Sequence, residues 1–447
     1  MHIRQDEFLQ TFSKAYIFGG GSSGISAANL LKKYGKKIYL IDKKKIEGDP
    51  FDGYLSDEIN FMEFEESIIV KSPGIHPSHK ILIAARENNV PVFSEIDIGC
   101  IFFTGKIIGV TGTDGKSTTT SLVWHLIKED FPNSKAGGNL GVPFTVFCEE
   151  KLDFAVLELS SYQLEDSMPI DFVACTILNL APDHLERHGT MDNYLQAKLK
   201  ILDFDNPKKI YITSDEFRKK IPIKNYNFVQ KSFGEELLTD ALILEQENSI
   251  RTKKFTYSTK NFVLKGRHNL SNLACAILLA ESIGSHPTNI QKQIKTFQGL
   301  THRFEYVKKI GKLEIINDSK STNLHSMLAG LKGFDKKTPF ILILGGIPKK
   351  EELSPMLEVL QTKNVVVFLY GEAVSSWEKP LRDILGVNLI VKENLKEVVD
   401  NSFEISEKMN SKYLLFSPAC ASFDQYKNFE ERGNHFKDLV NRRIDLS

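Results

Sequence analysis

The chain has 447 residues, of which 41% are hydrophobic and 26% are charged, and its 57 lysines and arginines are matched by 57 aspartates and glutamates. Such a balance creates no overall field that would attract nucleic acid or an anionic membrane surface, so we expect neither as a partner. The composition is that of an ordinary folded protein, and the length predicts about three domains.

The five cysteines stand singly along the chain, which disfavours a disulfide framework or a cysteine metal site and is typical of a reducing compartment. The sequence shows no apolar run that approaches the roughly 20 residues needed for a membrane span, and no secretory signal at its start. We therefore expect a soluble, cytoplasmic protein that works as a monomer on small molecules.

The first predicted unit is a βαβ arrangement of the Rossmann type. A strand at 15–18 leads into Gly19-Gly20-Gly21-Ser22-Ser23-Gly24, a helix follows from 25 to about 34, and a strand at 37–41 ends at Asp42. These glycines fit the pattern G-x-G-x-x-G, and Asp42 stands where a carboxylate would meet a ribose hydroxyl. NAD is one interpretation of this loop, and a mononucleotide or nucleotide sugar is the other.

A further strand at 67–70 runs into the turn 71–75, which is either a ligand-binding loop at a strand end or a plain Pro-Gly turn.

The most informative segment follows an apolar strand at 108–110: the run Gly112-Thr113-Asp114-Gly115-Lys116-Ser117-Thr118 leads into a helix predicted at 120–128. Backbone N–H groups at such a helix start can hold a polyphosphate, with the lysine as counter-charge and the serine hydroxyl on Mg²⁺. Val110 replaces the usual first glycine, which indicates a variant phosphate loop. We expect a nucleoside triphosphate here rather than an incidental strand-to-helix turn.

Strands at 154–158 and 174–178 continue this second unit and predict a mostly parallel sheet. Glu158 ends one of them, where it could hold Mg²⁺ or be a surface carboxylate. Asp183 and His184 follow the other, where they could serve a divalent ion or cap a loop. Lys198, considered by itself, is interpreted as an ordinary solvated helix lysine.

Strands at 313–316, 340–344 and 365–368 predict a third α/β unit. Asn269 and Asn272 share one face near a helix start, as a cap or as nucleotide contacts. Arg303 and Asp318 supply charged groups suited to a phosphate or carboxylate. The predicted fold class is α/β with three domains: a Rossmann-like domain, a central P-loop ATPase domain with a mostly parallel sheet, and a second Rossmann-like domain.

Together these runs resemble the Mur ligases, ATP-dependent amide ligases of peptidoglycan precursor synthesis. The resemblance rests on 112–118, Glu158, 182–188, His268-Asn269, His302-Arg303 and 317–320. The run 417–433 resembles the members of the family that add D-glutamate to UDP-N-acetylmuramoyl-L-alanine through an acyl phosphate.

The resemblance implies a UDP-sugar domain at 1–100, an ATP-binding domain at 101–300 and an amino-acid-binding domain at 301–447, the last closing for catalysis. The implied UDP-sugar contacts are Ser22, Ser23, Asp42, Lys43, Gly74 and Asn139. The implied ATP contacts are Gly112, Thr113, Asp114, Gly115, Lys116, Ser117, Thr118, Asn269, Asn272, Arg303 and Asp318.

The implied catalytic residues are Lys116, Asp183, His184, Lys198 and Lys320. Two Mg²⁺ ions would be held by Ser117, Glu158, His184 and a carbamylated Lys198. D-Glutamate would contact Thr322, Lys349, Ser422 and Phe429. Two departures from the family are visible: Asp114 replaces an asparagine, and Ile347-Pro348-Lys349-Lys350 replaces a polar-glycine turn, which leaves Lys349 and Lys350 as alternatives.

Four other functions stay open. The chain could be another Mur ligase or a folylpolyglutamate-type ligase, although the latter lacks a UDP-sugar domain. It could be a nucleotide-binding scaffold protein without turnover, although such a protein would not need Lys116, Glu158, His184 and Lys198 together. An NAD oxidoreductase remains conceivable for the first domain alone.

Overall fold

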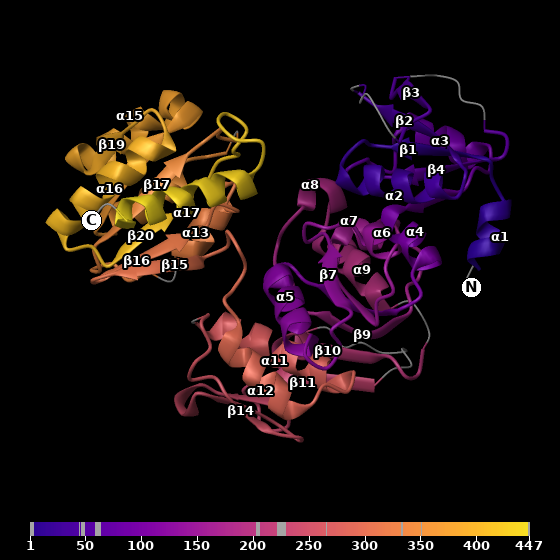
Figure 1. Ribbon diagram of the computed structural model, residues 1–447, viewed down its shortest axis with the longest axis horizontal. Coiled ribbons are helices and arrows are strands. Elements are labelled where there is room, and N and C mark those ends of the chain that lie inside the picture. Colours follow the sequence, from indigo (N-terminus) through magenta and orange to yellow (C-terminus); the bar gives the residue numbers. More distant parts are fainter. Residues whose placement is uncertain are drawn as a thin grey trace. The chain divides into compact units, whose positions relative to one another are not determined.

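The computed structural model describes residues 4–43, 45, 50–58, 64–202, 206–220, 229–264, 266–331, 334–349 and 351–445. They divide into two compact units, Met1–Phe297 and Gln298–Ser447 (Figure 1). The described residues form three sheets, one in each of the ranges 1–100, 101–300 and 301–447. The α/β fold class is confirmed, while the domain boundaries stay a prediction.

The first sheet is parallel, and its described strands lie in the order β3-β2-β1-β4-β5. Chain order reverses at β1, which pairs with β2 on one side and β4 on the other, and a ligand crevice opens at such a point. The strands are β1 Lys14–Phe18, β2 Lys37–Asp42, β3 Gly53–Ser56, β4 Ser67–Lys71 and β5 Val92–Ser94. The helices are α1 Gln5–Gln10, α2 Ser22–Lys33, α3 Lys80–Glu87 and α4 Glu95–Phe102.

Alternate residues of β1 enter different cores. Ala15 and Ile17 pack in the cluster that includes α2 and α4, whereas Tyr16 and Phe18 pack in the cluster that includes α3. Because both faces of the sheet are covered, the strand reads as a continuous apolar run rather than an alternating one.

The second sheet carries the phosphate loop. Its described strands lie in the order β14-β13-β12-β11-β10-β9-β6-β8-β7, parallel from β7 to β12 and antiparallel from β12 to β14. The strands are β6 Lys106–Thr111, β7 Ser134–Gly138, β8 Phe154–Glu158, β9 Phe172–Ile177, β10 Ile210–Ser214, β11 Val229–Gly234, β12 Ala241–Leu244, β13 Ser249–Thr252 and β14 Thr256–Ser258. The antiparallel edge is a feature that we did not predict from the sequence.

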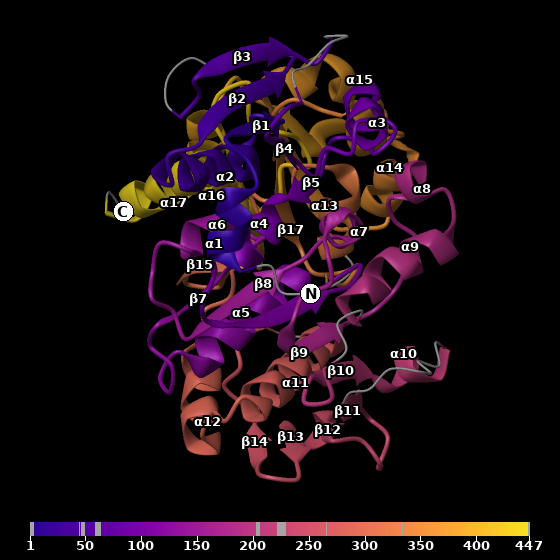
Figure 2. The same cartoon turned by 90° about the vertical axis from the view of Figure 1, so that its right-hand side faces the viewer.

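Helices cover both faces of this sheet. The helices α5 and α11 pack together on one face (Figure 2), with α12 beside them, and α6 and α7 pack on the other. The helices are α5 Lys116–Ile127, α6 Phe144–Phe147, α7 Ser161–Asp166, α8 Leu185–His188, α9 Met191–Leu199, α10 Asp215–Lys220, α11 Arg267–Ser282 and α12 Pro287–Thr296.

The unit Gln298–Ser447 holds the third sheet, in the order β15-β16-β20-β17-β18-β19, with the pair β15–β16 antiparallel and the other described pairs parallel. One core contains α13, α14 and α15, and the other contains α16 and α17. The strands are β15 Glu305–Ile310, β16 Leu313–Asn317, β17 Phe340–Gly345, β18 Val365–Tyr370, β19 Leu389–Val391 and β20 Tyr413–Phe416. The helices are α13 Leu324–Leu331, α14 Ser354–Gln361, α15 Val374–Leu385, α16 Leu395–Met409 and α17 Phe429–Asp445.

Two helices begin earlier than predicted. Helix α2 begins at Ser22 rather than residue 25, and α5 begins at Lys116. Ser22, Ser23, Lys116 and Ser117 therefore lie in the first turns of helices, where backbone N–H groups lack intrahelical partners. Within the part of the chain that the structure describes, no helix is long and apolar enough to cross a membrane.

Candidate active site

The phosphate loop connects β6 to α5 and depends on two glycines with positive φ. Gly112 has φ +148° and Gly115 has φ +78°, and Gly115 precedes the helix as its N-terminal cap. A Cβ on Gly115 would lie 2.5 Å from Oδ1 of Asn272, so the loop and helix α11 are in close contact at this point. The structure therefore brings Asn272 against the loop.

The loop wraps around the ammonium group of Lys116. Its Nζ donates to the carbonyl oxygens of Gly112 at 3.0 Å and Thr113 at 2.7 Å. The following residue, Ser117, is buried in the first turn of α5. A positive charge and a hydroxyl thus lie together at the helix start, as a triphosphate and its metal require.

Asn179, which follows β9, braces the loop and was not singled out in the sequence. Its Oδ1 accepts from the backbone N–H groups of Thr113 at 3.1 Å and Asp114 at 2.8 Å, and its Nδ2 donates to the Asp114 carbonyl at 3.1 Å. The available signal was an asparagine directly after a buried strand at the edge that carries the loop.

Glu158 ends β8 beside Val110 of β6, so it lies at the same strand edge as the phosphate loop. It is only 3% exposed. Its Oε1 accepts from Nδ2 of Asn139 at 2.8 Å, whereas its Oε2 has no hydrogen-bond partner among the described residues. Buried carboxylate oxygens are normally paired, so this oxygen suits a cation.

Lys198 is 1% exposed, so its interpretation as a solvated lysine is wrong. Its Nζ donates to the Gly112 carbonyl at 2.8 Å and lies 4.5 Å from the ring centroid of Tyr194. Burial, followed by the charge of Lys116, lowers the pKa of Lys198 to about 7. An appreciable fraction of this amine is therefore neutral near neutral pH.

His184 lies on the loop after β9, in a left-handed conformation with φ +53°. Its Nε2 is 3.4 Å from Oδ2 of Asp183 and its Nδ1 is 3.6 Å from Oε1 of Glu186. The ring packs against Tyr162 with centroids 5.0 Å apart. Half of the side chain remains exposed, so it is free to meet a ligand.

A metal in this region would need ligands beyond the protein side chains as they stand. Among the described residues, no group of three or more histidine, cysteine, aspartate or glutamate side chains is placed to hold an ion. Phosphate oxygens of a bound nucleotide could supply such ligands.

The candidate UDP-sugar residues lie at the ends of β1, β2 and β4. A Cβ on Gly24 would lie 2.0 Å from the Gly19 carbonyl oxygen, so the glycines allow α2 to approach β1 closely. The N–H of Gly20 donates to Oδ2 of Asp42 at 2.8 Å, and Oγ of Ser72 donates to the Gly19 carbonyl at 3.0 Å. These bonds bring three strand ends together around the glycine loop.

The other residues of this set are exposed or half-buried at the same strand ends: Ser22, Ser23, Lys43 and Gly74. Asn139 is placed differently, at the end of β7. Its N–H donates to the Glu158 carbonyl at 2.9 Å, in addition to its side-chain bond to that residue.

In the second unit, Asp318 follows β16 and is buried. It accepts from Oγ of Ser417 at 2.7 Å and from the N–H of Phe304 at 3.2 Å. Burial raises the pKa of Asp318 to about 7. Arg303 immediately precedes Phe304, and its positive charge opposes part of this rise in the pKa of Asp318.

Arg432 organises the loops of this unit and received no role from the sequence, although it stands in the C-terminal run. It is fully buried. Its guanidinium donates to the carbonyls of Ser319 at 2.8 Å and Cys420 at 3.0 Å. The loops after β16 and β20 are thereby held together.

The candidate D-glutamate residues lie on these loops. Antiparallel bonds join Ile347 to Ala421, which brings the segment of Lys349 next to that of Ser422. Nζ of Lys320 lies 5.8 Å from the ring centroid of Phe429. The remaining D-glutamate candidate, Thr322, is half-buried. Asn269, a candidate ATP contact in the first unit, is also half-buried. Lys350 lies outside the described residues.

Comparison with known proteins agrees with this geometry. Residues 110–280 match the family model described as the Mur ligase middle domain. A UDP-N-acetylmuramoylalanine–D-glutamate ligase of Leptospira borgpetersenii is 51% identical, with 96% of each chain covered. One from Leptospira interrogans is 48% identical over 97% of each chain, and one from Prochlorococcus marinus is 34% identical over 95% of this chain and 96% of its own.

Solved structures show the same fold at lower identity. A UDP-N-acetylmuramate–alanine ligase from Thermotoga maritima has a TM-score of 0.59 at 18% identity and covers 97% of this chain and 100% of its own. A MurF ligase from the same organism, solved in complex with ADP, has a TM-score of 0.57 at 16% identity, covering 97% and 99%. The chain therefore belongs to the Mur ligase family, in its group of UDP-N-acetylmuramoylalanine–D-glutamate ligases.

Proposed function

We propose that this protein is an ATP-dependent ligase that joins D-glutamate to UDP-N-acetylmuramoyl-L-alanine in peptidoglycan precursor synthesis. One observation carries the chemistry: the buried amine of Lys198 lies 2.8 Å from the Gly112 carbonyl of the phosphate loop. This contact supports Lys198 as a catalytic residue beside the proposed site of the transferred phosphate. The choice of D-glutamate is supported by the full-length similarity to relatives of that name.

The reaction needs activation because joining a carboxylate to an amine in water is uphill. The L-alanyl carboxylate attacks the γ-phosphorus of ATP, ADP leaves, and an acyl phosphate forms. The D-glutamate amine then attacks the acyl carbon, loses a proton, and expels phosphate. Such phosphoryl transfer depends on alignment and charge neutralisation more than on covalent help from the protein.

ATP is assigned to the range 101–300 with two contacts from the following domain. The loop Gly112–Thr118 would hold the phosphates through its N–H groups, and the ammonium of Lys116 would neutralise their charge. Helix α11 would contribute Asn269 and Asn272, of which the latter already contacts Gly115. Arg303 and Asp318 complete the proposed set.

Mg²⁺ is proposed at two positions, because the donor set suits it. Ser117 and Glu158 would hold one ion, and the unpaired Oε2 of Glu158 supports this assignment. His184 and a carbamylated Lys198 would hold the other, with Asp183 supporting the histidine. When bound, Mg²⁺ neutralises charge on the phosphate oxygens.

The environment of Lys198 supports the proposed carbamylation. The neutral amine attacks CO₂ and loses a proton, which converts a cation that would repel a metal into an anionic oxygen donor. The lowered pKa of Lys198, about 7, provides the neutral amine that this step needs.

The UDP sugar is assigned to the domain 1–100, at the strand ends that carry Ser22, Ser23, Asp42, Lys43 and Gly74. Asn139, which holds Glu158, would contact the same substrate near the reacting carboxylate. D-Glutamate is assigned to the domain 301–447, where Lys320, Thr322, Lys349, Ser422 and Phe429 would bind it. All these residues belong to one chain, so we propose a monomer acting in the cytoplasm, where ATP and nucleotide sugars are available.

The test measures phosphate release from ATP in the presence of Mg²⁺ and UDP-N-acetylmuramoyl-L-alanine, with each amino acid of a panel in turn. We expect release with D-glutamate and background release with L-glutamate, L-lysine, L-alanine or diaminopimelate. Release with a different member of the panel would overturn the assigned acceptor. Silence across the panel would favour a nucleotide-binding protein without turnover.

A further inference from the structure

Arg187 is a buried cation that the proposed reaction leaves without a role. It lies in the short helix α8, three residues after His184, and its side chain is 8% exposed. Its Nε and Nη2 donate to Oε2 of Glu165 at 3.0 and 2.9 Å. Its Nη1 donates to the carbonyl oxygen of Pro73 at 3.0 Å.

The bond to Pro73 crosses between two sheets of the first unit. Pro73 follows β4 of the first sheet and immediately precedes Gly74, a proposed UDP-sugar contact. Arg187 follows β9 of the second sheet, on the loop that carries His184. One guanidinium therefore connects the loop proposed for the sugar nucleotide with the loop proposed for the acyl phosphate.

A second buried ion pair strengthens the same junction. Lys71, at the end of β4, pairs with Asp166 at the end of α7, and both side chains are less than one-tenth exposed. Nη2 of Arg187 lies 3.7 Å from Oδ1 of Asp166. Two cations and the carboxylates of Asp166 and Glu165 balance each other, so the network adds no net charge to the junction.

The ring of Tyr162 links this network to His184. The Arg187 guanidinium lies 4.4 Å from the Tyr162 ring centroid, and the His184 ring packs on the same tyrosine at 5.0 Å. Loss of the guanidinium would remove one support of the ring against which His184 rests.

We propose that Arg187 is a positioning residue that fixes the His184 loop to the segment Lys71–Gly74. The loop that would hold the sugar nucleotide and the loop that would hold the reacting carboxylate thereby keep a fixed relative position. This inference rests on the proposed function. A planar guanidinium suits the task because it donates in fixed, divergent directions to Glu165 and Pro73 at once, whereas an ammonium is a single point charge.

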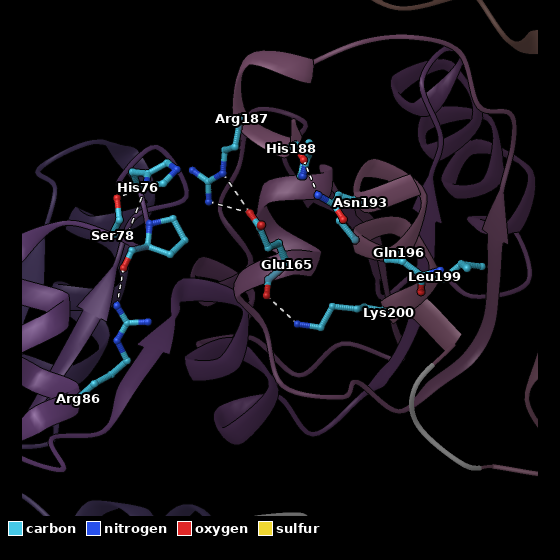
Figure 3. A pocket seen from close by; sticks show the side chains of 12 residues that line it. His76, Ser78, Arg86, Glu165, Arg187, His188, Asn193, Gln196, Leu199 and Lys200 are labelled. Atoms are coloured by element: carbon cyan, nitrogen blue, oxygen red, sulfur yellow. Dashed lines mark hydrogen bonds and ion pairs between the residues drawn. The ribbon is translucent and has the colours of Figure 1, made fainter. Parts of the chain in front are cut away.

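A pocket of about 700 Å³ gives solvent access to this junction (Figure 3). Arg187, Glu165 and Lys200 line it from the second sheet's domain, and His76 and Arg86 line it from the first. Arg86 is a natural control, because it is exposed and donates to the carbonyl of Pro77, further along the same loop, at 2.9 Å.

The test compares Arg187→Ala with Arg86→Ala in steady-state phosphate release. We expect Arg187→Ala to lower kcat/KM for UDP-N-acetylmuramoyl-L-alanine about tenfold to a hundredfold, the size typical of supporting residues, and to leave the KM for ATP within about twofold. Arg86→Ala should match the unchanged protein. A rise in the KM for ATP as large as the loss in kcat/KM for UDP-N-acetylmuramoyl-L-alanine, or a normal Arg187→Ala enzyme, would overturn the inference.

Chemical rescue separates positioning from a general loss of structure. Because the pocket reaches Arg187, guanidinium or ethylguanidinium at millimolar concentration should restore part of the lost activity of Arg187→Ala but not alter Arg86→Ala. Absence of rescue in a folded variant would contradict the proposal. If Arg187→Ala does not fold, Arg187→Lys is measured instead, and we expect the same selective loss in kcat/KM for UDP-N-acetylmuramoyl-L-alanine. A normal kcat/KM in Arg187→Lys would then contradict the proposal.

The proposed function and this inference fail in different ways. If the unchanged protein shows no D-glutamate-dependent release, the proposed function is wrong. If the unchanged protein is active and Arg187→Ala equals it, the function stands and the role of Arg187 is wrong.

Discussion

At the scale of single residues, burial determines the chemistry of the proposed centre. Lys198 would be unremarkable on a helix surface, where its amine would stay protonated. Its enclosure beside Lys116 and Tyr194 lowers its pKa to about 7, which provides the neutral amine that the proposed carbamylation needs. The sequence could not show this, because a lysine in an amphipathic helix has the same pattern whether its face meets solvent or another element.

The pH dependence of reactivation tests this environment. The enzyme is first depleted of CO₂, and CO₂ is then added back. We expect activity to return with a rate that rises with pH up to about 7 and then levels off, because the amine is mostly neutral above its pKa. Dissolved CO₂ is held constant across the series, and phosphate release is the readout. A lysine with an ordinary pKa would instead keep accelerating about tenfold per pH unit well beyond pH 8, which would contradict the lowered pKa.

Glu158→Gln tests the proposed metal contact. The amide keeps an oxygen that can accept from Asn139 but removes the charge of the unpaired, buried Oε2. We expect kcat to fall at least tenfold and the Mg²⁺ concentration for half-maximal rate to rise, while the Tm without Mg²⁺ stays equal or increases. An unchanged Mg²⁺ requirement would argue against Glu158 as a ligand.

Two further residues show where sequence reasoning stops. Asn179 and Arg432 hold loops through backbone contacts, Asn179 on the phosphate loop and Arg432 on the carbonyls of Ser319 and Cys420. Such contacts depend on the three-dimensional path of the backbone, which no local pattern shows. By contrast, the places of Lys116 and Glu158 in the fold were predictable from local patterns. Lys116 stands where a glycine turn leads from a strand into a helix, and Glu158 stands at the end of a strand.

At the scale of elements, close packing of a helix on a strand explains the first glycine loop. Gly24 lies in the first turn of α2, where a Cβ would lie 2.0 Å from the backbone oxygen of Gly19. Gly21 has φ −73°, and a Cβ there would meet no described atom within 4 Å. Close packing therefore explains the glycine at position 24 but not the glycine at position 21.

This difference gives a paired prediction. We expect Gly24→Ala to destabilise the protein by about 1–3 kcal/mol and to raise the KM for the UDP sugar, because α2 must move away from β1. Gly21→Ala should leave stability within about 0.5 kcal/mol. Chemical denaturation and substrate titration measure both variants, and equal effects would contradict the close approach as the cause.

The order of strands and helices was largely predictable, because short apolar runs typical of strands alternate with segments of helical periodicity. The starts of α2 and α5 were placed too late, since serine, threonine and glycine in the first turn look like loop residues in sequence. The antiparallel edge β12–β14 escaped prediction because its strands are short and sit on a sheet otherwise built from strand–helix alternation.

At the scale of the whole molecule, the chain consists of two compact units with their own cores. The unit Met1–Phe297 contains two sheets joined by buried polar contacts. In one of these contacts, the carboxylate of Glu95 accepts hydrogen bonds from the N–H and the hydroxyl of Thr145, at 2.6 and 2.8 Å. Length and motifs predicted three ranges, but sequence does not reveal how firmly neighbouring ranges pack.

Separate cores predict separable unfolding. We expect Arg432→Ala to lower the temperature of the calorimetric transition of the unit Gln298–Ser447 and to leave that of Met1–Phe297 unchanged. Each carbonyl that loses its hydrogen bond should cost about 1–3 kcal/mol of stability. Arg442→Ala, which removes an exposed arginine of the same helix, serves as the control. Equal shifts of both transitions would show that the units unfold together.

The most direct measurement follows oxygen from substrate to phosphate. UDP-N-acetylmuramoyl-L-alanine labelled with ¹⁸O in its alanyl carboxylate is turned over with ATP and D-glutamate, and the released phosphate is examined by mass spectrometry. An acyl phosphate transfers one carboxylate oxygen to phosphate, so we expect one ¹⁸O in each phosphate from doubly labelled substrate. Unlabelled phosphate, formed while the D-glutamate product accumulates, would contradict activation of the carboxylate by phosphoryl transfer.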